Sequence, residues 1–296
     1  MSSERRYIWI AMFCVCFFWG TTYLALRIGV KDVPGLYFAG IRNFLAGLAL
    51  TGFYLMKGHQ FPSWETLKKL ALISFLLLVV SNGMMSWSMQ FITSGLGAII
   101  AAMTPLWIAI FSMILLQKNH LPLKVILGLL IGFTGISGIF YDNLADLFNP
   151  SFRLGIILAL GATMSWSLGA VITSKQKPDI HILFGTGIQM LFAGVVLLII
   201  SIVTGNAVSI SSFTISSWYA LIYLITFGSL IGYGAFVYAV SKLPPAKVSI
   251  YAYINPIVAL FLGWLILHED NLNPMMGIGS FATLLGVYLV NSGNKK

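Results

Sequence analysis

The feature that most constrains the fold is a series of ten long apolar segments, separated by short stretches that hold nearly all of the charged residues. A helix needs about 20 apolar residues to cross the hydrocarbon core of a bilayer. In hydrocarbon every backbone polar group needs an internal partner, and these segments lack the alternating pattern of barrel strands, so we expect helices. The sequence therefore predicts an all-α integral membrane protein with ten transmembrane helices. The expected spans are residues 7–26, 34–56, 70–91, 94–116, 125–141, 154–173, 182–203, 218–240, 248–267 and 275–290.

The composition excludes an ordinary soluble domain, because 58% of the residues are hydrophobic and 8% are charged, against about 25% charged in soluble domains. Ten crossings account for nearly all of the 296 residues, so we expect the lipid bilayer as the surroundings and no separate extramembrane domain. There is no phosphate-binding glycine-rich loop followed by Lys-Ser/Thr, and no acidic residue falls within a span. We therefore expect no cofactor, no bound metal and no proton relay.

The basic residues fall mostly on alternate sides of the expected spans. With the amino terminus inside, the outer segments hold only Arg27, Lys31 and Arg153. This asymmetry follows the positive-inside rule and predicts that both termini are cytoplasmic. It also explains the formal charge of +9 without a nucleic-acid partner. The expected inner segments hold Arg5, Arg6, Lys57, Lys68, Lys69, Lys118, Lys124, Lys175, Lys177, Lys242, Lys247, Lys295 and Lys296.

The chain also repeats itself, with residues 1–145 as the first copy and 146–296 as the second. Gly40-Ile41 and Ala46-Gly47 recur as Gly187-Ile188 and Ala193-Gly194, and Trp19 falls on Trp166. At a slightly larger offset Pro105, Gly128 and Gly135 fall on Pro256, Gly279 and Gly286. Five spans are an odd number, so the second copy is expected to enter the membrane upside down. Inverted repeats are typical of secondary transporters that bind substrate near the midplane.

Arg42 is the only charged side chain within any expected span. Placing it near the bilayer centre costs roughly 3 kcal/mol on insertion scales, which indicates that it faces a cavity or a partner. A guanidinium binds carboxylate groups in a bidentate fork, so a contact with an anionic solute is one interpretation. A structural clamp on carbonyl oxygens, or a surface residue that snorkels, is the other.

Several mid-span aromatic and polar side chains are candidates for a solute cavity. Trp19 and Trp166 lie well inside their spans, away from the interfacial belt where tryptophan is common. Asn82, Ser86 and Gln90 recur every four residues and give the third span a polar stripe. Packing and interhelical hydrogen bonds explain such residues equally well. The further aromatic candidates are Tyr23, Trp87, Tyr233 and Tyr238.

Two matched pairs, Thr104-Pro105 and Asn255-Pro256, fall in the middle of the fourth and ninth spans. A proline interrupts the helical hydrogen-bond ladder, so we expect Pro105 and Pro256 to produce a fixed kink or a hinge. Thr104 and Asn255 add polar groups beside them.

An intramembrane enzyme is a weaker alternative. Gly135-Ile136-Ser137-Gly138 resembles the Gly-x-Ser-Gly of intramembrane serine proteases, but such a site needs a histidine base within reach of the serine. The histidines fall in loops or at span ends, so the sequence does not favour catalysis. These histidines are His59, His120, His181 and His268.

In the order and duplication of these features the chain resembles the EamA family of the drug/metabolite transporter superfamily over nearly its full length. The residues that carry the resemblance are Trp19-Gly20, Arg42 with Ala46, the run from Gly95 to Leu106, and the run from Ala246 through Asn255-Pro256 to His268-Glu269. The resemblance implies a ten-helix permease in a bacterial inner membrane that exports amino acids, related metabolites or toxic compounds. It implies a central cavity lined by the first, third, fourth, sixth, eighth and ninth helices.

One departure concerns the end of the fourth span, where the family's Leu-Gly-Glu is replaced by Leu116-Gln117-Lys118, whereas the second copy keeps Glu269. The small four-helix members of the superfamily use a membrane glutamate for proton exchange, and the first span here contains none. Proton coupling is therefore not carried over to this chain.

The sequence predicts a non-enzymatic secondary transporter that exports a small metabolite, such as an amino acid or derivative, or a drug-like compound. A receptor or assembly factor built on the same fold is the alternative, and the pattern fits a monomer and a homodimer alike. The expected cavity residues are Trp19, Tyr23, Arg42, Asn82, Trp87, Thr104, Trp166, Tyr233, Tyr238 and Asn255.

Overall fold

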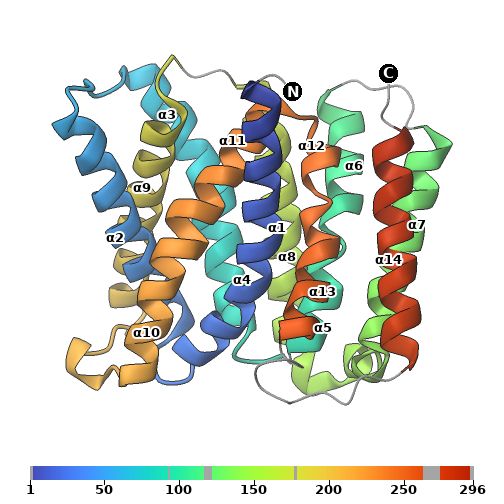
Figure 1. Cartoon of the computed structure of the whole chain (residues 1–296). Coiled ribbons are helices and arrows are strands. Elements are labelled where there is room, and N and C mark those ends of the chain that lie inside the picture. The colour runs from blue at the N-terminus through green and yellow to red at the C-terminus, as the bar shows by residue number, and fades with distance from the viewer. Residues whose placement is uncertain (1–2, 93, 117–121, 177–178, 263–273, 294–296) are drawn as a thin grey trace.

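The computed structural model describes residues 3–92, 94–116, 122–176, 179–262 and 274–293, and over these residues the chain is helical and contains no strand. The long helices stand side by side, and α1 begins at the same face of the bundle at which α14 ends (Figure 1). Gln117, Lys118, His268 and Glu269 lie outside the described residues. The elements are α1 (Ser3–Gly29), α2 (Gly35–Met56), α3 (Trp64–Ser74), η1 (Phe75–Asn82), α4 (Gly83–Ser88), α5 (Ser94–Ala101), α6 (Thr104–Leu115), α7 (Leu123–Ile139), η2 (Tyr141–Asn143), η3 (Ala145–Phe148), η4 (Pro150–Phe152), α8 (Arg153–Lys175), α9 (Ile182–Val203), η5 (Ile210–Ser212), α10 (Ile215–Tyr223), η6 (Leu224–Tyr233), α11 (Gly234–Lys242), α12 (Pro245–Val248), α13 (Tyr251–Leu262) and α14 (Pro274–Gly293).

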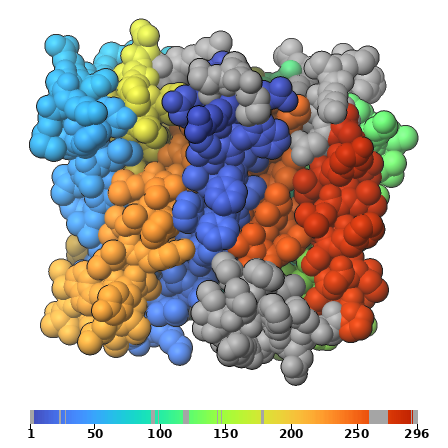
Figure 2. Space-filling model, in the orientation of Figure 1, coloured from blue at the N-terminus to red at the C-terminus, as the bar shows by residue number. Residues whose placement is uncertain are grey.

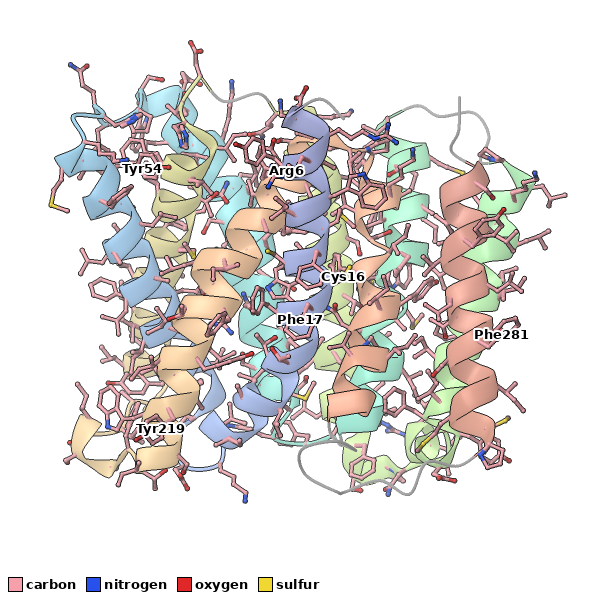
Figure 3. All side chains as sticks on the ribbon, in the orientation of Figure 1. Arg6, Cys16, Phe17, Tyr54, Tyr219 and Phe281 are labelled. Carbon is pink, nitrogen blue, oxygen red and sulfur yellow. The ribbon has the colours of Figure 1, made fainter. Side chains whose placement is uncertain are left out.

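Six helical stretches among the described residues are long and apolar enough to cross a membrane, so the chain is a multi-pass membrane protein. Shorter apolar helices cover Ile99–Leu115, Leu123–Ile139 and Pro274–Val290. The expected span 248–267 extends past Leu262, beyond the described residues, so ten crossings stay a prediction. The outer faces of the helices carry exposed large apolar side chains, as Phe281 and Tyr219 illustrate at the edges of the bundle (Figure 3). Such a surface suits contact with lipid. The six stretches are Glu4–Leu26, Gly35–Met56, Trp64–Ser88, Pro150–Lys175, Ile182–Val203 and Ile215–Lys242.

Glycines allow α2 and α9 to approach until their backbones touch. A methyl group at Gly47 would overlap the backbone nitrogen of Leu191, and one at Gly194 would overlap that of Phe44. Gly194 and Leu191 are the repeat equivalents of Gly47 and Phe44, so the same contact is made twice with the partners exchanged. Reciprocal contacts of this kind occur between surfaces related by a two-fold axis. The order of the contacts runs in opposite directions along the two helices, which are therefore antiparallel.

A second glycine crossing joins α7 to α14. A Cβ at Gly128 would lie 2.7 Å from the carbonyl oxygen of Gly286, and a Cβ at Gly135 would lie 2.7 Å from that of Gly279. Since Gly128 and Gly135 correspond to Gly279 and Gly286 in the repeat, this crossing is also reciprocal. Small residues let membrane helices pack closely by van der Waals contact. The two crossings lie on opposite sides of the bundle (Figure 1).

Two long helical stretches contain a wider, π-helical segment in the middle. The segment η1 separates α3 from α4, and η6 separates α10 from α11. The two segments occupy corresponding positions in the two copies of the repeat. π-helical turns occur frequently at functional sites.

The helix α1 is packed between the α10–η6–α11 stretch on one side and α13 on the other, as the central column in Figure 2 shows. Polar contacts tie α1 to the first of these neighbours along its length. The Glu4 carboxylate pairs with Lys242 at 2.8 Å, and the Thr21 and Tyr223 hydroxyls are 2.5 Å apart. Beyond the other end of α1, the Thr214 hydroxyl donates to the Asp32 carboxylate at 2.8 Å.

Two histidines meet at the face of the bundle where α1 begins. The rings of His59 and His181 are 5.8 Å apart, and Tyr54 packs 4.7 Å from His181. Partial burial, with the nearby His59 and Lys57, lowers the pKa of His181 from its ordinary value of 6.5. The folded state therefore favours the neutral imidazole.

We expect the purified protein to lose thermal stability as the pH falls below about 6.5. The pKa of His181 is lower in the folded than in the unfolded state, so the unfolded state binds more protons there. The stabilisation is present above the ordinary pKa and is lost as the pH falls through the folded pKa. Melting temperatures measured between pH 8 and pH 5 test this, and His181→Gln is expected to flatten the dependence. An equally steep dependence in His181→Gln would contradict this role of His181.

Candidate functional site

A cavity lies in the middle of the bundle, and about 150 Å³ of it is accessible to the centre of a water molecule. Its walls come from α1, α2, η1, α4, α5, α6, α8, η6 and α13, so both copies of the repeat contribute. A cavity of this size holds several waters or part of a small solute. Both π-helical segments line it, which places the widened turns at the cavity wall.

Most of the side chains that the sequence singles out lie at this cavity. Trp87 and Tyr238 are not among its lining residues: Trp87 is 39% exposed, and Tyr238 packs against the main hydrophobic cluster. The side chain of Tyr23 lies outside the described residues. The expected residues that line the cavity are Trp19, Arg42, Asn82, Thr104, Trp166, Tyr233 and Asn255.

Aromatic rings form one part of the wall. The ring of Trp19 lies 5.3 Å from that of Trp166 and 5.0 Å from that of Tyr251, both edge to face. Phe236 packs behind them, 4.9 Å from Trp166. Each such edge-to-face pair stabilises the fold by about 0.5–1.5 kcal/mol, in addition to the contribution from burying the apolar surface of the rings. The Trp19 indole also donates to the carbonyl oxygen of Gly228 at 3.0 Å, which fixes the ring orientation.

Arg42 and Asn82 form a polar part of the wall. The Arg42 guanidinium donates through Nη2 to the Asn82 Oδ1 atom at 3.0 Å, and the Arg42 residue is 8% exposed. Its Nε atom is buried without a hydrogen-bond partner among the described residues. The neighbouring Asn43 donates to the Ala39 carbonyl at 2.9 Å within α2. Arg42 therefore lines the cavity, and among the described residues Asn82 is the one acceptor for its five N–H donors.

The two prolines occupy different settings. The fourth span was expected to be one helix, but the structure ends α5 at Ala101 and begins α6 at Thr104, with Pro105 in the first turn of α6. Proline suits that position because its missing N–H would have no helical partner there. Pro256 lies inside α13. The Asn255 amide, oriented to satisfy its partners, donates to the Cys16 carbonyl at 2.8 Å and so links α13 to α1.

Further residues that the sequence did not indicate line the cavity, among them Asn43 beside Arg42 on α2. The available signal was the presence of small polar residues in mid-span, as at Ser81 and Ser229. The polar stripe of the third span reaches the cavity only at Asn82, since Ser86 is buried elsewhere and Gln90 is exposed. The lining residues missed are Thr22, Leu26, Asn43, Leu78, Ser81, Met85, Ala101, Thr163, Leu224, Gly228, Ser229, Tyr251 and Ala252.

The serine that resembles a protease nucleophile makes a local bond. The Ser137 hydroxyl donates to the Phe133 carbonyl at 3.0 Å within α7, and it is not among the cavity residues. Of the four histidines, His59 and His181 are described and meet each other at the membrane face. His120 and His268 lie outside the described residues.

Comparison with known proteins identifies relatives over nearly the whole chain. The sequence model of the EamA-like transporter family matches twice, at residues 6–141 and 153–292. The protein named uncharacterized inner membrane transporter YedA of Escherichia coli K12 is 38% identical over 258 residues, which cover 86% of this chain and 80% of YedA. The uncharacterized transporter YoaV of Bacillus subtilis is 25% identical over 276 residues, covering 91% of this chain and 92% of YoaV. A protein crystal structure superposes with a TM-score of 0.80 at 15% identity, covering 97% of this chain and 98% of that one, which supports the fold alone.

Proposed function

Because the chain belongs to the EamA-like transporter family, we propose that it is a secondary transporter that exports a small metabolite, such as an amino acid or derivative, or a drug-like compound. The observation that carries this proposal is the central cavity, which combines aromatic walls with one buried cation. Aromatic faces supply apolar contact area, and a few placed polar groups orient the solute. The family and the cavity both favour carriage over catalysis.

The proposed architecture is ten spans in two inverted copies, 1–145 and 146–296. The reciprocal glycine crossings support it, since each joins one helix of the first copy to its antiparallel equivalent in the second. The matched π-helical segments add to this support. Transport then proceeds by alternating access, with the two copies rocking about the cavity.

We propose that the expected residues lining the cavity contact the solute, and that the helix break before Pro105 and the proline inside α13, Pro256, permit small changes in helix direction. The distribution of Lys and Arg supports an orientation with both termini in the cytoplasm. YedA is named an inner membrane transporter, and we propose the same membrane for this chain.

Transport is expected to stop when a bulky group is attached covalently to a side chain inside the cavity. Ser229 lines the cavity and is buried, and Ser229→Cys changes one atom in a background where Cys14 and Cys16 are replaced by serine. The variant is reconstituted in liposomes and offered a panel of radiolabelled amino acids, organic acids and amphipathic drugs, before and after reaction with a bulky methanethiosulfonate reagent. Uptake of a panel member should fall by at least tenfold after the reaction.

The matched control is Ser216→Cys, which is exposed on α10 outside the cavity and should transport equally before and after labelling. No uptake of any panel member by folded, unlabelled protein would overturn the transport proposal and favour a receptor or assembly role. Uptake that labelling at position 229 leaves unchanged would overturn the route through this cavity.

A further inference from the structure

The charge balance of the cavity is unusual, because its described wall contains one cation and no anion. Arg42 is the only Lys or Arg among the lining residues, and none of the eight Asp and Glu residues is among them. The ion pairs found among the described residues, Lys68–Glu65 and Lys242–Glu4, lie on the surface. The positive charge of Arg42 is therefore not neutralised by the described part of the protein.

The hydrogen bonding of Arg42 is also incomplete. Its contact with Asn82 uses one of five N–H donors, and the buried Nε has no partner among the described residues. A buried charge is costly unless it is paired and hydrogen-bonded. A guanidinium binds a carboxylate through two parallel N–H···O bonds. A planar, singly charged carboxylate would therefore supply the charge and the acceptors that Arg42 lacks among the described residues.

Building on the transport function proposed above, we propose that the solute is an organic monocarboxylate with an apolar or aromatic tail and no free amino group. The carboxylate binds Arg42 beside Asn82, and the tail packs against Trp19 and Trp166. Among the solute classes proposed above, this narrows the choice to carboxylate derivatives without an ammonium group, because the ammonium of a free amino acid would lie near Arg42 and would find no carboxylate on the described wall. A phosphate monoester carries more charge than one guanidinium neutralises.

Three probe molecules that share a phenylethyl group test which net charge the cavity prefers in its solute. They are 3-phenylpropionate, phenylalanine and 2-phenylethylamine, with net charges of −1, 0 and +1. Binding to the full-length protein in detergent is measured by isothermal titration calorimetry, which does not depend on transport. We expect 3-phenylpropionate to bind at least tenfold more tightly than either of the others.

Two substitutions then test the role of Arg42. Arg42→Gln should weaken binding of 3-phenylpropionate by roughly ten- to hundredfold, the usual loss for a hydrogen bond to a charged group. Asn82→Asp keeps Arg42 but supplies an internal carboxylate at the position that now accepts its hydrogen bond, so it should weaken binding to a similar degree while the fold is retained. Arg153→Gln removes an exposed charge at the start of α8 and should bind as the parent does.

A preference for phenylalanine or 2-phenylethylamine would overturn the proposal, as would the absence of binding by all three probes to folded protein. Undiminished binding of 3-phenylpropionate to folded Asn82→Asp would overturn the role of Arg42, and this variant decides the matter if Arg42→Gln fails to fold. These outcomes differ from failure of transport itself, which the labelling of position 229 reports independently.

Discussion

Replacing Gly47 by alanine is expected to remove most of the folded protein from the membrane, whereas Gly52→Ala on the same helix leaves its amount unchanged. The added methyl group at Gly47 overlaps the backbone of Leu191 on α9, and no side-chain adjustment relieves a clash with backbone. At Gly52 there is open space. Overpacking typically lowers the free energy of unfolding by about 1–3 kcal/mol, and we expect a clash with backbone to cost about 3 kcal/mol or more. That is a large part of the stability of a typical domain.

The measurement is the height of the monodisperse peak in fluorescence-detected size-exclusion chromatography of detergent extracts, at equal expression. Alanine at Gly286, which abuts Gly128 and Gly132, should behave as it does at Gly47. Alanine at Gly277 on the same helix, where space is open, should be tolerated. Equal peaks for Gly47→Ala and Gly52→Ala would show that α2 and α9 do not pack backbone to backbone at Gly47.

Trp166→Ala is expected to lower solute export by at least tenfold, while Trp87→Ala retains it. Trp166 lines the cavity and packs against Trp19 and Phe236, so its loss removes contact area from the solute and from its neighbours. Burying an aromatic side chain of this size contributes about 1.5–3 kcal/mol. Trp87 is partly exposed and does not line the cavity, which makes it a control of the same residue type.

Cells that express each variant to the same level in the membrane are compared by metabolite analysis of the medium at matched density. A compound enriched by the parent and by Trp87→Ala, but not by Trp166→Ala, identifies the solute class. Equal enrichment by both variants would remove Trp166 from the solute path. The conservative change Trp166→Phe should restore part of the export, because it keeps an aromatic face.

The sequence predicted the helical class and the family because hydrophobic length and composition leave few alternatives in a membrane. It also found the glycines that form both helix crossings, because identical residues recur at the two repeat offsets. The same pattern does not say which glycines touch. Their antiparallel, reciprocal pairing follows from three-dimensional packing alone.

The site was predicted less completely, for physical reasons that particular residues illustrate. Arg42 was found because a charge in an apolar span is costly and therefore conspicuous. Trp87 and Trp166 look alike in the sequence, yet one is partly exposed and the other lines the cavity, because helix rotation decides which face turns inward. The helix α4 ends at Ser88, so Gln90 lies beyond the helix that carries Ser86, and the four-residue period of Asn82, Ser86 and Gln90 did not report one face. Small residues such as Ser229 give a weak signal because serine also serves helix packing.

The two glycine crossings have a mechanical consequence. Each crossing joins one helix of the first copy of the repeat to one helix of the second, α2 to α9 and α7 to α14. The two crossings lie on opposite sides of the bundle (Figure 1). A line drawn from one crossing to the other runs parallel to the membrane plane. A rotation of the first copy of the repeat against the second about this line would leave the helices in contact at both crossings. The closest contacts at each crossing are made by backbone atoms, as at Gly47 with Leu191 and at Gly128 with Gly286. In the alternating access that we propose, both crossings would lie on the axis of rotation and would stay packed while the cavity between them opens to one side of the membrane or the other.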